Sequence, residues 1–432
     1  MTPVELLRQL LRFDTTNPPG NEGECVEFLR SLLDDAGCET EVYAKEPGRP
    51  NLLTRLTGTG SGPPFLLYGH VDVVTTAHQR WQHPPFGGEL VDGYVWGRGA
   101  LDMKGGVAML VSAFLRAKTE GFRPRGDLIL AVLSDEEAGG DFGARFLVEE
   151  HPHLFDGVRH ALGEFGGFSY EIAGKRFYPI QIAEKQICWM KATIRGAGGH
   201  GALINRGGTM ARLARFLQDL DRKPLPVHVT PVARLFLESV AAEVPATQRV
   251  ALEALLKPRL AGRALRLLGE RTRRFEPMLR NTVNATIVRG GDKINVVPSE
   301  IELELDGRAL PGSGPDVLIG ELRDAVGEDV ELELVRHDPG PSEPDLTLFE
   351  TLAEVLRELD PEGIPVPLLQ VGVTDGRFFS RLGIQTYGFL PMRLPTDFEF
   401  LGLIHAADER IPAEALDFGT DAIYRALQRL AA

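Results

Sequence analysis

Cysteine is scarce in this chain of 432 residues, which contains only Cys25, Cys38 and Cys188. Three scattered thiols cannot build the disulfide framework of a small secreted domain, and they suit a reducing compartment. The N-terminus also lacks a basic stretch followed by an unbroken apolar run, so it does not read as a signal peptide. We therefore expect a cytoplasmic protein.

Long hydrophobic runs and an excess of positive charge are missing as well. No stretch approaches the roughly 20 apolar residues that a membrane-spanning helix requires, so we expect no membrane partner. The formal net charge is −14, whereas a protein that binds nucleic acid usually presents a basic face. We therefore expect no nucleic-acid partner either.

Apolar sequence is abundant, and it is arranged as alternating strands and helices. Hydrophobic residues make up 43% of the chain. A chain of 432 residues is too long for one compact core, so we expect two domains. Residues 65–70 and 128–133 form continuous apolar runs, which are typical of strands buried on both faces of a sheet. We predict an α/β catalytic domain with a mostly parallel central sheet, built from residues 1–186 and 340–432.

A different pattern occupies residues 187–339. Its predicted elements follow the order strand, helix, strand, strand, helix, strand, which is the split unit of ferredoxin-like domains. Residues 222–280 are rich in leucine, alanine and arginine and look helical, so we interpret them as an insertion. The sequence therefore predicts a βαββαβ domain that interrupts the first domain.

Imidazole and carboxylate side chains stand at the ends of predicted strands and in the loops between them. Three of them directly follow predicted strands of the parallel sheet, and such sheets bind ligands at the carboxyl ends of their strands. Two imidazoles and three carboxylates suit a pair of divalent ions, with zinc as the first choice and cobalt or manganese as alternatives. The five candidate ligands are His70, Asp102, Glu137, Glu164 and His405.

Two neighbours of these ligands have predicted roles. Asp72 lies two residues from His70, on the same face of an extended chain, and would hydrogen-bond the imidazole and fix its tautomer. Glu136 precedes Glu137, so one carboxylate can bind metal while the other takes a proton from water that the metal has acidified. A structural histidine or a solvated turn would explain any one of these residues, and only their joint placement indicates a metal-dependent hydrolase.

The motifs around these residues resemble those of the M20 metallopeptidase family. This family includes acetylornithine deacetylase, succinyl-diaminopimelate desuccinylase, aminoacylase-1 and glutamate carboxypeptidases, and the likeness covers essentially the whole chain. The most specific match is the sequence GRGALDMKGG. The matching segments are residues 69–72 (GHVD), 97–106 (GRGALDMKGG), 135–139 (DEEAG), 163–164 (GE) and 404–409 (IHAADE).

The resemblance implies a division of the ligands between two zinc ions. His70 and Glu164 would hold one ion, Glu137 and His405 the other, and Asp102 would bridge them. It also implies a cis peptide bond after Asp102.

The resemblance further implies that Glu136 is the general base that acts on the water bridging the metals. The ferredoxin-like domain would be a lid that also forms homodimers, and His200 would reach the partner's active site and stabilise the oxyanion. Substrate contacts are expected from Asn295, from Arg308, which could clamp a carboxylate, and from Gly376 in the TDGR segment. Turns and salt bridges would explain these last three residues nearly as well.

The substrate implied is a small N-acyl amino acid or a short peptide with a free carboxylate. The resemblance implies that the glutamate at position 164 matches the deacylases and carboxypeptidases of the family, because the aminopeptidases of the family tend to carry aspartate at the matching position. A di- or tripeptidase of the aminopeptidase type is the first alternative. A catalytically silent binding protein on the same scaffold is the second.

Overall fold

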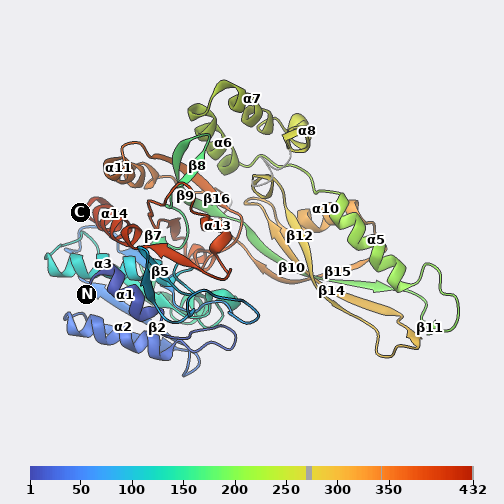
Figure 1. The fold of residues 1–432 in the computed structure, drawn as a ribbon, viewed down its shortest axis with the longest axis horizontal. Coiled ribbons are helices and arrows are strands. Elements are labelled where there is room, and N and C mark those ends of the chain that lie inside the picture. Colours follow the sequence, from blue (N-terminus) through green and yellow to red (C-terminus); the bar gives the residue numbers. More distant parts are fainter. Residues whose placement is uncertain (269–274, 342, 431–432) are drawn as a thin grey trace. The chain divides into compact units, whose positions relative to one another are not determined.

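The computed structural model describes residues 1–268, 275–341 and 343–430. The chain forms two compact units (Figure 1). The first comprises Met1–Ile182, Asp345–Leu368 and Thr374–Ala432, and the second comprises Ala183–Pro344 and Leu369–Val373. The second unit thus interrupts the first.

A nine-stranded sheet is the centre of the first unit, in the order β1-β2-β6-β3-β7-β17-β9-β16 with β8 paired to β9. Its middle strands, β6, β3, β7 and β17, run parallel to one another. The predicted α/β fold with a mostly parallel sheet is confirmed. The strands are β1 Thr40–Ala44, β2 Pro50–Leu56, β3 Phe65–His70, β6 Leu128–Leu133, β7 His160–Gly163, β8 Tyr170–Ile172, β9 Lys175–Glu184, β16 Ile364–Gln370 and β17 Gln385–Gly388.

Helices cover both faces of this sheet. Side chains alternate along a strand, and in β3 Leu66 and Tyr68 join a buried cluster that contains residues of α4 and α12. Gly69 faces the opposite way, toward Met103 and Val107 of α3. The helices are α1 Pro3–Leu10, α2 Gly23–Asp35, α3 Lys104–Thr119, α4 Ala144–Glu150, α11 Phe349–Leu359, α12 Gly376–Phe379, α13 Phe400–Leu403 and α14 Ala413–Leu430.

Short elements surround the main sheet. Three strands form a second small sheet in the order β18-β5-β4, and three 3-10 helices lie in loops. These elements are β4 Glu89–Val91, β5 Tyr94–Trp96, β18 Arg410–Pro412, η1 Glu136–Ala138, η2 Pro152–Phe155 and η4 Ser380–Leu382.

The second unit contains an antiparallel sheet in the order β12-β14-β10-β15. Along the chain its elements run β10, α5, β12, β14, α10, β15, so the predicted βαββαβ order is confirmed. Among the residues that the structure describes, the helices α6 to α8 lie between α5 and β12. The elements are β10 Gln186–Arg195, β11 Gly199–His200, α5 Thr209–Arg222, α6 Pro231–Glu243, α7 Ala246–Leu255, α8 Pro258–Leu268, η3 Glu276–Met278, β12 Thr282–Arg289, β13 Val296–Val297, β14 Glu300–Ala309, α10 Pro315–Val326 and β15 Glu331–Asp338.

Membrane-spanning helices were not expected from the sequence. Within the described parts of the chain, every helix is too short or too polar to cross a lipid bilayer.

The parallel centre of the sheet should dominate the stability of the first unit. Leu67 of β3 is fully buried between Leu130 and Leu162 of the neighbouring strands, so Leu67→Ala should lower the free energy of unfolding by about 2–5 kcal/mol. Leu90→Ala in β4, where the side chain is 45% exposed, should change it by about 0.5 kcal/mol or less. Urea denaturation followed by circular dichroism measures both, and equal losses would contradict this assignment of the core.

Candidate metal centre

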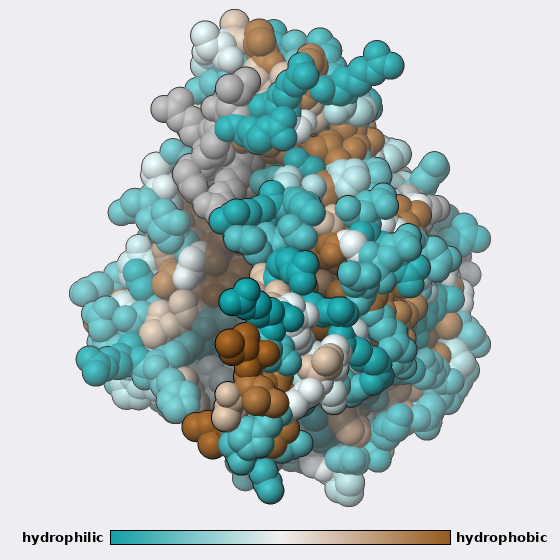
Figure 2. All heavy atoms as spheres, turned by 90° about the vertical axis from the view of Figure 1, so that its right-hand side faces the viewer, coloured by the Kyte–Doolittle hydropathy of each residue, from teal (hydrophilic) through white to brown (hydrophobic). Residues whose placement is uncertain are grey.

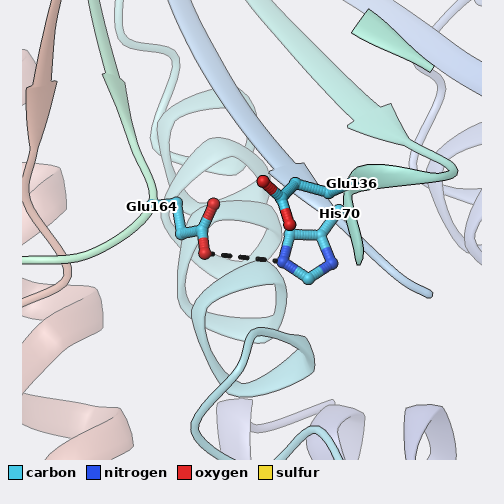
Figure 3. A group of neighbouring side chains, drawn as sticks. All are labelled: His70, Glu136 and Glu164. Carbon is cyan, nitrogen blue, oxygen red and sulfur yellow. Dashed lines mark ion pairs between the residues drawn. The ribbon is translucent and has the colours of Figure 1, made fainter. Parts of the chain in front are cut away.

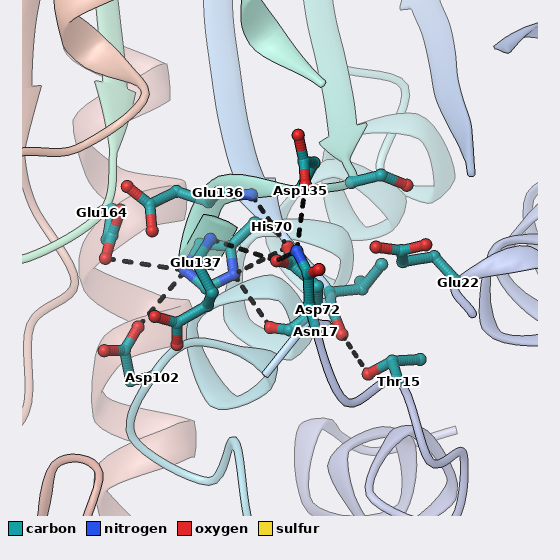
Figure 4. Close-up of polar contacts among 12 residues, drawn as sticks. Thr15, Asn17, Glu22, His70, Asp72, Asp102, Asp135, Glu136, Glu137 and Glu164 are labelled. Carbon is teal, nitrogen blue, oxygen red and sulfur yellow. Dashed lines mark hydrogen bonds and ion pairs between the residues drawn. The ribbon is translucent and has the colours of Figure 1, made fainter. Parts of the chain in front are cut away.

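The five predicted ligands gather at the carboxyl end of the parallel strands. His70 is the last residue of β3, Glu164 directly follows β7, and Glu137 lies in η1, just beyond the end of β6 (Figure 4). Asp102 stands two residues before α3, and its peptide bond to Met103 is cis, as the resemblance implied. His405 follows α13 and has a left-handed backbone with φ of 61°. The sheet therefore assembles ligands that are far apart in sequence.

The carboxylate of Asp102 stands between two imidazoles. Its Oδ1 lies 3.2 Å from Nε2 of His70, and its Oδ2 lies 3.2 Å from Nε2 of His405. Glu164 Oε1 is 3.6 Å from the same His70 nitrogen (Figure 3), and Glu137 Oε1 is 3.3 Å from the same His405 nitrogen. Each imidazole thus faces Asp102 and one glutamate, which gives two groups of ligands that share one carboxylate.

The tautomer of His70 is set by Asp72. Nδ1 of His70 lies 3.0 Å from the main-chain carbonyl oxygen of Asp72 and 3.4 Å from its carboxylate. Both are acceptors, so Nδ1 carries a hydrogen and donates it. Nε2 of a neutral His70 then points a lone pair at Asp102 and Glu164, and such a cluster is stable only around a proton or a cation.

Several buried ligand atoms have no hydrogen-bond partner among the described residues. They are Nε2 of His70, Oδ1 of Asp102, Oε1 of Glu137 and Oε2 of Glu164. Buried polar atoms are normally satisfied, so atoms that converge without partners indicate a ligand. Imidazole and carboxylate are the donors that zinc prefers, and cobalt and manganese accept them as well. The residues therefore fit a pair of divalent cations.

The pKa values show how strongly this cluster favours positive charge. Burial, and then the charge of Asp102, raises the pKa of Glu137 to about 8. The nearby carboxylates of Asp102 and then of Glu137 raise the pKa of His405 to about 10. Burial opposes protonation of His70, but the carboxylates around it, Glu164 first, hold its pKa well above the usual value. A divalent cation would compensate the same negative charge.

Glu136 stands beside this cluster and is held by Arg377, a contact the sequence did not predict. Its carboxylate comes within 4.8 Å of ligand atoms of His70 and Glu164 (Figure 3). Oε1 accepts a hydrogen bond from Nη1 of Arg377 at 3.3 Å, and burial raises the pKa of Glu136 although Arg377 opposes the shift. Arg377 lies in the TDGR segment, and this motif is the feature of the sequence that could have identified it. Gly376, the residue predicted there, is buried, and a Cβ on it would lie 2.6 Å from Oγ1 of Thr386.

The carboxylate of Asp72 has a role beyond its predicted contact with His70. Oδ1 accepts a hydrogen bond from the backbone amide of Glu136, and Oδ2 accepts one from the amide of Glu137, both at 3.1 Å. A single buried carboxylate therefore holds the backbone of both adjacent glutamates (Figure 4).

A buried ion pair between Arg98 and Glu409 holds the loops of two other ligands. Glu409 Oε1 accepts hydrogen bonds from the backbone amides of Leu101 at 2.7 Å and Asp102 at 3.1 Å. Its Oε2 accepts from Nη1 of Arg98 at 2.5 Å, and Nη2 of Arg98 donates to the carbonyl of His405 at 3.2 Å. Both residues lie in motifs quoted above, but no pattern in the sequence indicates that they contact each other.

The remaining predicted site residues, His200, Asn295 and Arg308, belong to the second unit. His200 is exposed in β11, and its Nδ1 accepts a hydrogen bond from the amide of Ala202 at 3.1 Å. Asn295 is exposed, and its carbonyl accepts one from the amide of Gly201 at 2.8 Å.

Arg308 is already engaged by a carboxylate of the chain. Its Nε and Nη2 donate to the two oxygens of Asp306 at 2.7 and 3.2 Å. The paired edge of this guanidinium is therefore occupied, and Nη1 is the nitrogen that has no hydrogen-bond partner among the described residues.

Comparison with known proteins agrees with this geometry. A family model described as peptidase family M20/M25/M40 matches residues 66–429. Aminoacylase-1 of Sus scrofa is 28% identical over 444 residues, which cover 99% of this chain and 95% of that protein. A probable carboxypeptidase S-like 2 of Dictyostelium discoideum is 28% identical over 371 residues, covering 81% and 68%.

The fold is also similar to that of a solved structure from the M20 family. The crystal structure of an M20 family metallo-carboxypeptidase from Sulfolobus solfataricus superposes with a TM-score of 0.72 at 16% identity, covering 99% of this chain and 98% of that one. The family model spans most of the present sequence and includes all five clustered residues. The chain therefore belongs to peptidase family M20, and it is a hydrolase that acts on amide bonds.

Proposed function

We propose that this protein is a two-zinc amidohydrolase, with cobalt or manganese as possible substitutes, that cleaves small N-acyl amino acids or short peptides with a free carboxylate. The observation that carries this proposal is the position of Asp102. Its two oxygens face two different histidines at the same distance of 3.2 Å, and each histidine has its own glutamate. A shared carboxylate between two such groups is what a pair of metal ions requires.

The residues divide into two metal sites around Asp102. We assign His70 and Glu164 to one ion and Glu137 and His405 to the other, because these pairs already face each other. Two divalent cations held there would supply Lewis acidity, which polarises an amide carbonyl and acidifies a water molecule.

We assign the role of general base to Glu136. Its Oε1 is held by Arg377, which leaves Oε2 to take a proton from the attacking water and to pass it to the leaving amine. Burial raises the pKa of this carboxyl, which makes it a better base. Asp72 keeps the Glu136 backbone in place during both transfers.

The substrate assignment rests on the names of the relatives and on three residues that the family resemblance singled out. Relatives that match over most of their length are called aminoacylase and carboxypeptidase, which agrees with an amide substrate that carries a carboxylate. We assign contacts with that substrate to Asn295, Arg308 and Gly376. Asp306 already accepts hydrogen bonds from Nε and Nη2 of Arg308. A substrate carboxylate would therefore bind to Nη1 of Arg308 and would not form a bidentate pair with Nε and Nη2.

The cellular location stays a prediction. All three cysteines are free and buried, as suits the reducing compartment inferred from their number.

Two adjacent substitutions separate the base from the ligand. Glu136→Gln should retain both metal ions and lose about 10²–10⁴-fold in turnover, because a general base contributes that much. Glu137→Gln, its matched neighbour, should lose metal as well, because it removes a ligand. Metal analysis of the purified variants together with initial rates measures this, and near-normal turnover of Glu136→Gln would show that another group is the base.

A substrate panel tests the proposed function directly. N-acetyl amino acids and dipeptides with blocked amines should be hydrolysed by the metal-loaded protein, and free-amine dipeptides should not. Removal of the metal with a chelator should abolish hydrolysis, and added zinc should restore it. Hydrolysis of free-amine dipeptides alone would identify the aminopeptidase type, and a protein that binds no metal and hydrolyses nothing would be the silent binding protein.

We also infer that the second unit forms a homodimer. Exposed apolar side chains gather on one face of the molecule (Figure 2), and large ones flank β11 and β13, where His200 lies. Contiguous exposed apolar residues mark protein interaction sites. These residues are Leu203 (71% exposed), Ile204 (86%), Ile294 (106%) and Val296 (49%).

The dimer can be tested with one charge substitution. Ile204→Asp should convert a dimer into a monomer in light scattering coupled to size exclusion, because a desolvated carboxylate opposes association. Val250→Asp in α7, at a side chain that is 66% exposed, is the control and should stay dimeric. His200→Ala should keep the dimer and the metal but lose turnover. A wild-type protein that is monomeric at all concentrations contradicts the inference.

A further inference from the structure

Asn17 lies next to the turn that carries Glu136 and Glu137, between two buried carboxylates. Its Nδ2 is 2.9 Å from Oδ2 of Asp72 and 3.0 Å from Oδ1 of Asp135 (Figure 4). All three side chains are almost completely buried. We propose that Asn17 is a positioning residue that holds the Glu136–Glu137 turn in place by bridging these two carboxylates, an inference that rests on the proposed function.

The orientation of the Asn17 amide is forced by its partners. Both neighbours are carboxylate oxygens, which can only accept hydrogen bonds, so the two hydrogens of Nδ2 must face them. The opposite orientation would direct Oδ1 at both carboxylates. Oδ1 instead has no hydrogen-bond partner among the described residues, although it is buried. The chain thus leaves one buried acceptor without a hydrogen bond, at a cost in stability, in order to place the two donors.

The two bridged carboxylates bind different backbone amides in and after the turn. Asp72 accepts hydrogen bonds from the amides of Glu136 and Glu137. Asp135 directly precedes the turn with φ of 72°, and its Oδ2 accepts from the amide of Phe142 at 3.0 Å. Asn17 links these two anchors, and it shares Oδ2 of Asp72 with the amide of Glu137.

Charge explains why an amide suits this position. Asp135 Oδ1 lies 2.9 Å from Nη2 of Arg49, and the same guanidinium donates to both oxygens of the buried Glu22 at 2.7 and 3.2 Å. Arg49 is therefore shared between Asp135 and Glu22. The neutral Nδ2 of Asn17 supplies two donors to Asp72 and Asp135, whereas an aspartate there would add a further negative charge.

The segment that carries Asn17 is fixed along the exit of β3. The amide of Asn17 donates to the carbonyl of Val73 at 2.8 Å, and the amide of Val73 donates to the carbonyl of Thr15 at 3.1 Å. Oγ1 of Thr15 donates to the carbonyl of Val71 at 2.6 Å, and Thr15 is fully buried. Thr15 therefore anchors the same segment without touching either carboxylate, which makes it a matched control.

The experiment compares Asn17→Ala, Asn17→Asp and Thr15→Val in the full-length protein. Metal-free protein is titrated with zinc by calorimetry, and kcat and KM are measured on the best substrate of the panel. Asn17→Ala should lower kcat and the zinc affinity about 10–100-fold, as loss of a residue that orients metal ligands does, with little change in KM. The loss of affinity should fall mainly on one of the two zinc equivalents, because Glu137 serves only one. Asn17→Asp should lose at least as much, and Thr15→Val should stay close to wild type.

Hydrogen–deuterium exchange of residues 136–142 provides a readout that needs no metal. The amides of Glu136, Glu137 and Phe142 should exchange faster in Asn17→Ala than in Thr15→Val or in wild type. Equal exchange, zinc affinity and kcat in Asn17→Ala and Thr15→Val would overturn the proposal. If the wild-type protein binds no zinc and hydrolyses nothing, the proposed function fails, and the exchange rates still decide whether Asn17 holds the turn.

Discussion

The structure of the first unit depends on one electrostatic constraint, which is the concentration of carboxylates at the end of a buried parallel sheet. Asp102, Glu136, Glu137 and Glu164 converge there with two imidazoles. Buried charges are stable only when they are paired or coordinated. Buried hydrogen bonds in the surrounding loops hold these groups together against their mutual repulsion.

Two buried carboxylates outside the ligand set perform this task in the same way. Asp72 accepts hydrogen bonds from two consecutive backbone amides, those of Glu136 and Glu137. Glu409 does the same for Leu101 and Asp102. Each holds the main chain of a candidate ligand and does not engage the carboxylate of that residue. Outer residues of this kind orient metal ligands and control metal affinity.

The elements of the fold that could be predicted are those with long, unambiguous patterns. The strands Phe65–His70 and Leu128–Leu133 have the predicted bounds, because continuous apolar runs are visible in one sequence. The strand Lys175–Glu184 was missed, because Pro179 within it argues against a strand. Strands of three residues, such as Tyr94–Trp96, are too short to show any period.

The types of candidate ligand, the motifs that carry them and a candidate base beside one of them could be predicted from the sequence alone. How the oxygens of Asp102 divide between two histidines, and which residues hold the candidate ligands, depends on the tertiary structure. Glu409 lies 307 residues from Asp102, Arg377 lies 241 from Glu136, and Asn17 lies 118 from Asp135. Such partners meet because parallel strands bring their carboxyl ends to one edge of the sheet, and no local pattern in the chain records which side chains will then be in contact.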